Sequence, residues 1–103
     1  MENNTKRPVD RIKDFANWLI ENKIIKSMYA FEKLCGLSHF YIKNLAATEK
    51  GNPGVDTIAK IYEVFPVVSL EWLVTGKGKM FKAKGTDEEI GNMIKIRIIN
   101  KLL

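Results

Sequence analysis

The chain has 103 residues, of which 46% are apolar and 28% charged, and this balance predicts one small globular domain rather than a disordered chain. Lys and Arg number 17 and Asp and Glu number 12, and the net charge of +5 favours a nucleic acid or another acidic partner. One cysteine and one histidine exclude a disulfide scaffold and the usual zinc spacings. Since neither a long apolar run nor an apolar leader occurs, we expect no membrane span and a cytoplasmic location.

The start of the chain predicts an arm followed by a helix. Residues 1–8 are polar and end in a proline, which favours a flexible N-terminal arm. Apolar residues then recur at spacings of three and four over residues 9–22, which predicts a first helix with Asp10 as its cap. Arg11 is one of the polar residues that fall between them.

Two short helices separated by a tight turn are predicted next. Ser27 is a suitable cap for a helix over residues 28–35, and Gly36 ends it because glycine readily adopts the left-handed conformation that follows a helix. Ser38 then predicts the cap of a helix over residues 39–47. Such a pair holds two helices at a steep angle, so the second helix can project one face outward.

Three more helices are predicted in the second half. A loop rich in Gly, Pro and Asn precedes a helix that Asp56 opens and Pro66 ends. Ser69 caps a short helix over residues 70–75, and a Gly- and Lys-rich linker follows. We therefore expect an all-α fold in three parts: an arm (1–8), a five-helix domain (9–82), and a linker with an amphipathic C-terminal helix (83–103).

The last predicted helix differs in character from the rest. Residues 86–103 begin with a capping box and carry three basic and three acidic residues, so the basic surplus lies in the preceding body. An apolar helix of this size is unstable when fully exposed. It either packs on its own body or pairs with a second copy, and we favour the pair slightly.

The stretch SMYAFEKLCGLSHFYIKNLAA, with NPGVDTIAKIYEVFP and SLEWLVTGKGKMF after it, resembles the helix-turn-helix domain of the Cro and phage-repressor (XRE-like) family. The resemblance covers about residues 9–82. It implies a five-helix repressor-like fold whose recognition helix, residues 39–47, enters the major groove of double-stranded DNA. It further implies a transcriptional regulator that acts as a homodimer on a palindromic operator.

Two residues depart from the family pattern. Glu32 stands where the family most often has Ala, at the closest approach of the two motif helices, and would either splay the pair or bend away to solvent. Met28 stands where the family often has a polar residue that contacts phosphate. One backbone contact is then missing.

The candidate base contacts lie on the outward face of the recognition helix. Asn44 can pair with adenine, and Lys43 can reach guanine acceptors or a phosphate. Phe40 can lie against a thymine methyl, or its ring folds back into the core. Lys43 has the alternative of a solvated position. The candidate base-contacting residues are His39, Phe40, Lys43 and Asn44.

The candidate phosphate contacts flank the motif. The amide groups at a helix start favour an anion, which suits Ser27 and Ser38, and the hydroxyl of Tyr41 could reach a phosphate even if its ring packs inward. The resemblance implies that the loop after the recognition helix lies beside the DNA backbone. Lys6 and Arg7 either add contacts or belong to a disordered arm. The candidate phosphate-contacting residues are Ser27, Ser38, Tyr41, Lys50 and Asn52.

Other functional classes have little support in the sequence. None of the glycine-rich phosphate-binding or nucleophile motifs occurs, and Cys35 is expected in the core, so we expect no enzyme, no catalytic residue, no cofactor and no metal. One alternative is an antitoxin or another protein-interaction module with a helix-turn-helix body. Another is the N-terminal domain of a self-cleaving repressor. The 18 residues after the linker are too few for the peptidase domain of such a repressor, so the chain would be a truncated piece of it.

Overall fold

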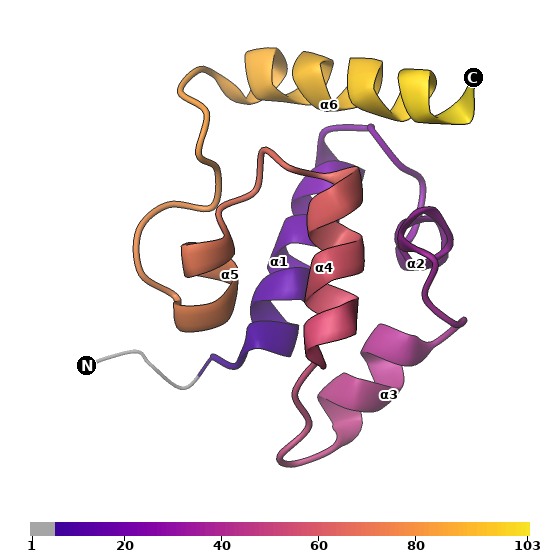
Figure 1. Cartoon of the computed structure of the whole chain (residues 1–103), viewed down its shortest axis with the longest axis vertical. Helices are drawn as coiled ribbons and strands as arrows, with labels where there is room; N and C mark the ends of the chain where they lie inside the picture. The colour runs from indigo at the N-terminus through magenta and orange to yellow at the C-terminus, as the bar shows by residue number, and fades with distance from the viewer. Residues whose placement is uncertain (1–5) are drawn as a thin grey trace.

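The computed structural model describes residues 6–103, which form six helices joined by short connections (Figure 1). Within this part of the chain the only β pairing is an isolated antiparallel bridge between Val68 and Phe81. The prediction of an all-α fold is confirmed. The helices are α1 (Pro8–Glu21), α2 (Met28–Cys35), α3 (Tyr41–Ala47), α4 (Val55–Val64), α5 (Leu70–Thr75) and α6 (Asp87–Leu102).

The core is built around α1, which contacts α2, α3 and α5, while α2 also contacts α4. Three fully buried rings join these elements: Phe15 of α1 lies edge-on to Phe31 of α2 at 6.0 Å and to Phe65, just after α4, at 5.1 Å. Phe31 and Phe65 stack at 5.8 Å. Burial of each such ring contributes about 1.5–3 kcal/mol, so the aromatic cluster fixes how the helices pack.

Helix ends agree with the prediction where the capping side chain directly precedes or follows its helix in the sequence. The hydroxyls of Ser27 and Ser69 each accept a hydrogen bond from the backbone N–H three residues later. Thr86 and Glu89 form a reciprocal capping box. Gly36 ends α2 in the left-handed conformation, with φ +72°. These ends were predictable because each depends on residues three or four positions apart.

The start of α1 differs from the prediction. The helix begins at Pro8, whose fixed φ suits the first helical position, and Arg7 is the cap residue. Asp10 is therefore not the cap. It lies in the first turn, where its carboxylate accepts a 2.9 Å hydrogen bond from the backbone N–H of Arg7.

The last three residues of the predicted arm contact the body. Lys6 forms a 2.7 Å ion pair with Asp14, Arg7 and Pro8 are half-buried, and Pro8 begins α1. Residues 1–5 of the predicted arm lie outside the described residues.

Arg11, one of the polar residues between the apolar positions of α1, is buried. Its guanidinium donates to the carbonyls of Leu73 and Val74 at 2.9 and 2.8 Å. These carbonyls lie in the last turn of α5, where a helix leaves its C=O groups without intrahelical partners. Arg11 therefore joins α5 to α1.

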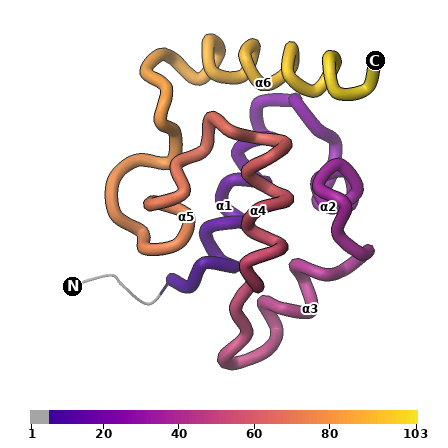
Figure 2. Tube along the Cα trace, viewed as in Figure 1, coloured from indigo at the N-terminus to yellow at the C-terminus, as the bar shows by residue number. Residues whose placement is uncertain are grey.

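The C-terminal helix lies across one end of the bundle, while α3 lies at the opposite end (Figure 2). Ile90 and Ile94 belong to the core, and Gly91 lies against Ile24, from which an added Cβ would be 3.4 Å away, an ordinary van der Waals distance. A second apolar face of α6 remains exposed to solvent. Its members are Ile96, Ile99 and Leu102, which together with Leu103 just after the helix we call the outer stripe; Met93, although half-exposed, faces the connection between α4 and α5.

Candidate nucleic-acid interface

The predicted base-contacting residues share one exposed surface. His39, Phe40, Lys43 and Asn44 are all exposed, and Phe40 leaves 51% of its surface accessible. The alternative in which Phe40 folds into the core is therefore wrong. The surface lies on the turn before α3 and on α3 itself, away from α6 (Figure 1).

An aromatic stack forms the tip of this surface. The rings of His39 and Phe40 are nearly parallel, with centroids 3.8 Å apart, and Tyr29 of α2 adds a third ring 4.4 Å from His39. The ammonium of Lys43 lies 5.5 Å from the Phe40 centroid, within cation–π range. The stack combines exposed ring surface with hydrogen-bonding edges, a combination suited to contact with base edges and methyl groups.

The turn before α3 has an unusual backbone. Phe40 has φ +68°, a left-handed conformation that non-glycine residues rarely adopt. α3 starts at Tyr41, two residues later than predicted, and Ser38 does not cap it. A strained position persists only where surrounding contacts over-determine it, and here those contacts come from a buried carboxylate.

That carboxylate belongs to Glu32 of α2, which leaves only 2% of its surface exposed. Its two oxygens accept from the backbone N–H of Phe40 at 3.1 Å and of Ile42 at 3.0 Å. The Glu32 side chain therefore does not bend away to solvent. It satisfies N–H groups that the start of α3 would otherwise leave unpaired.

Arg7 holds the opposite end of α3. Its guanidinium donates to the carbonyls of Ala46 at 2.8 Å, Thr48 at 2.6 Å and Gly51 at 3.2 Å, with a longer 3.3 Å bond to Glu49. Charged side chains from α2 and from the start of α1 thus fix both ends of α3.

The predicted phosphate contacts are spread around this surface. Lys50 and Asn52 are exposed in the loop between α3 and α4, and Ser38 is exposed in the turn. Ser27 is half-buried as the cap of α2, and its hydroxyl accepts from the N–H of Ala30. The remaining candidate, Tyr41, is also half-buried, and its hydroxyl lies 2.9 Å from that of Thr57.

The basic surplus does not single out this surface. Residues 27–54 carry three Lys and two Glu, a net charge of +1. Four lysines lie instead in the connection between α5 and α6, at positions 77, 79, 82 and 84. The shape and hydrogen-bonding groups of the α2–α3 face, rather than its charge, make it the candidate interface.

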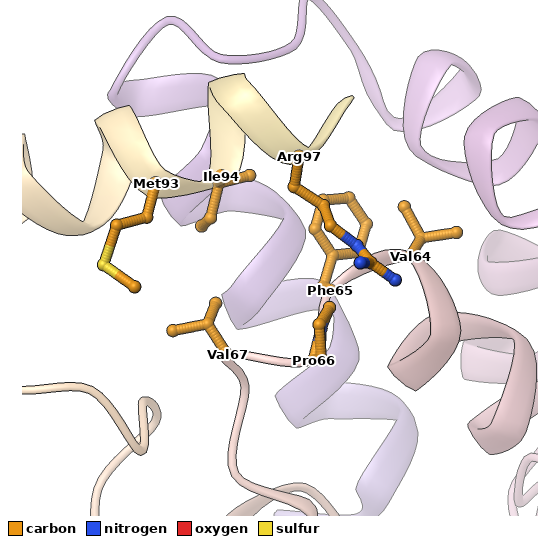
Figure 3. A pocket seen from close by; sticks show the side chains of 7 residues that line it. All are labelled: Val64, Phe65, Pro66, Val67, Met93, Ile94 and Arg97. Atoms are coloured by element: carbon orange, nitrogen blue, oxygen red, sulfur yellow. The ribbon is translucent and has the colours of Figure 1, made fainter. Parts of the chain in front are cut away.

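A small hollow lies between α6 and the connection from α4 to α5 (Figure 3). It is open to solvent and has a volume of about 150 Å³, whereas small-molecule sites usually span roughly 300–1,000 Å³. Its one charged lining residue, Arg97, donates to the carbonyl of Glu63 at 2.7 Å. The hollow is better explained as the seam where α6 meets the body.

Cys35 is buried, and burial raises the pKa of its thiol to about 12, so the group stays protonated and unreactive near neutral pH. Residues 6–103 hold no cluster of three or more His, Cys, Asp or Glu side chains arranged to bind a metal ion. No helix in this range has the length and apolar character needed to cross a membrane.

No model of a protein family, no curated protein and no solved structure matches the chain significantly. The resemblance to the Cro and phage-repressor family consequently stays a prediction from the residues quoted above.

Proposed function

We propose that the protein is a transcriptional regulator that binds double-stranded DNA sequence-specifically, with α3 in the major groove. The main support is the exposed face of α3 and its preceding turn, which presents polar and aromatic groups from a helix held at both ends. Preorganised groups on a short helix are what base recognition needs, because a shifted helix misplaces every contact. Such a regulator would act in the cytoplasm, at the nucleoid.

The roles follow from the chemistry of each side chain. Asn44 pairs with adenine through its amide, and Lys43 reaches guanine acceptors or a phosphate. One face of the His39 ring is covered by Phe40, so its nitrogen-bearing edge is the part that donates. Phe40 presents its exposed ring to a thymine methyl.

Phosphate contacts orient the domain without reading sequence. In this proposal Lys50 and Asn52 contact the DNA backbone from the loop after α3. Ser27 contacts it from the start of α2, and Ser38 from the turn before α3. Tyr41 donates to a phosphate only when the Thr57 hydroxyl supplies the proton for their shared hydrogen bond.

We also propose a homodimer that pairs through the outer stripe of α6 and binds a palindromic operator. The stripe supports this because α6 is apolar on opposite sides, and only one side is covered by the body. The same stripe supports the second candidate, an antitoxin-like module that binds a different protein. Self-association of the purified chain distinguishes the two.

Binding to a DNA duplex should weaken steeply with salt. Each phosphate neutralised contributes about −0.9 to the slope of log affinity against log salt concentration. Replacing Lys50 with Gln should make the slope shallower by about one unit. The matched control is Lys23→Gln, an exposed lysine just after the end of α1, next to Ile24, which lies against α6; this change should leave the slope unchanged. Absence of binding to any duplex at low salt would rule out the proposed function.

A further inference from the structure

We infer that Arg7 is a positioning residue for DNA recognition, which fixes α3 and the following loop without touching DNA. The inference rests on the proposed function. It also replaces the expectation that Arg7 contacts a groove or a phosphate from a flexible arm.

The guanidinium of Arg7 meets a converging set of carbonyls. Ala46 belongs to the last turn of α3 and accepts from Nη2 of Arg7, while Thr48, Glu49 and Gly51 lie in the loop that follows and share the two N–H groups of Nη1, all within 3.3 Å. A helix end leaves its last carbonyls unpaired and carries a partial negative charge, and both features favour a cation there. With its two terminal nitrogens engaged in this way, Arg7 has little capacity left for a phosphate.

The backbone of Arg7 is fixed as well as its side chain. Arg7 is the cap residue of α1, and its N–H and Nε face the carboxylate of Asp10 at 2.9 and 3.8 Å. The next residue is a proline, which restricts the backbone at this junction. Since α1 is the scaffold of the core, Arg7 ties the C-terminal end of α3 directly to the rigid part of the molecule.

The loop itself is shaped to receive the side chain. Gly51 is buried, and a Cβ added there would lie 2.6 Å from the carbonyl oxygen of Leu45, so only glycine fits. This close approach brings the loop carbonyls around the guanidinium. Lys50 and Asn52 flank Gly51, so the same contacts orient the proposed phosphate-binding side chains.

The seven residues of α3 are too few for a stable isolated helix. Its orientation therefore depends on contacts from other elements, with Glu32 at its start and Arg7 at its end. A lysine at position 7 would keep the positive charge but lacks the planar fork that reaches several carbonyls at once. Arg7→Lys thus separates positioning from charge.

The test compares Arg7→Lys, Arg7→Gln and a control, Lys6→Gln, which removes an exposed charge one residue away. Each variant is measured for binding to a selected duplex and to a random duplex across salt concentrations, with thermal unfolding to confirm folding. Arg7→Lys should lower the preference for the selected duplex about tenfold, comparable to one misread base pair. Its salt slope and its affinity for the random duplex should equal those of the wild type, and Lys6→Gln should keep the preference.

A phosphate-contacting Arg7 gives the opposite pattern. Arg7→Lys would then keep full affinity, and Arg7→Gln would make the salt slope shallower by about 0.9. Either result overturns the inference while leaving DNA binding intact. Amide hydrogen exchange of the free protein is a second measurement, and it needs no DNA. Arg7→Lys should speed exchange within residues 46–51 but not in α4, and unchanged exchange there would also overturn the inference.

Discussion

Replacing Glu32 with alanine should lower the free energy of unfolding by about 2–4 kcal/mol. The carboxylate accepts from the N–H groups of Phe40 and Ile42 at 3.1 and 3.0 Å, and without it these groups lose their acceptors. The Ile42 N–H is buried and the Phe40 N–H is partly buried. An unsatisfied buried group costs about 1–3 kcal/mol and a partly buried one less, and relief of the buried carboxylate offsets part of that sum. Urea denaturation of wild type and variant measures the difference.

The matched variants isolate the cause. Glu32→Gln keeps one acceptor oxygen and should lose about half as much stability. Glu49→Ala removes an exposed carboxylate from the loop after α3 and should change stability by less than about 0.5 kcal/mol. If Glu32→Ala unfolds at the wild-type urea concentration, the carboxylate does not hold the start of α3.

The two faces of α6 should respond differently to the same substitution. Ile94→Ala should lower the free energy of unfolding by about 2–4 kcal/mol, because Ile94 is only 2% exposed and its loss leaves a cavity against the body. Ile99→Ala should change the stability of the monomer by less than about 0.5 kcal/mol, because Ile99 is 56% exposed. Denaturation of both variants at low protein concentration makes the comparison.

Sedimentation of the same pair tests the proposed dimer. Ile99→Ala should weaken self-association, and Ile99→Asp should abolish it, because a charge on the outer stripe would have to be buried in the pair. A wild-type chain that remains monomeric at high concentration would exclude pairing through this stripe. Equal losses of stability in Ile94→Ala and Ile99→Ala would contradict the assignment of inner and outer faces.

The sequence predicted the helices well because their ends depend on neighbouring residues. Ser27 and Gly36 delimit α2, and Ser69 and Gly76 delimit α5, as the pattern indicated. The same rule was wrong for Ser38, because the start of α3 is held by a carboxylate from another helix. The predicted exposure of the candidate base-contacting residues is confirmed. Their contact with DNA stays a prediction.

The charged residues inside the fold were harder to predict. Arg7 contacts carbonyls about forty positions away, and Arg11 contacts the end of α5 more than sixty positions away. Helical periodicity assigns a side chain to a face of its helix, but it does not predict that this face meets a backbone carbonyl from an element distant in the sequence. A usable signal existed for Glu32, which stands directly after Phe31 and three residues before Cys35, on the inward side of its helix.

The most direct test of base reading by α3 is selection of bound duplexes from a random library. Wild type and Asn44→Ala are compared, with Asn17→Ala, an exposed asparagine on α1, as the control. The wild type and the control should enrich the same motif. Asn44→Ala should relax the preference at one base pair, a loss of about 1–3 kcal/mol in discrimination. A wild type that enriches no motif, or an Asn44→Ala variant that enriches the wild-type motif unchanged, would contradict base recognition by this face of α3.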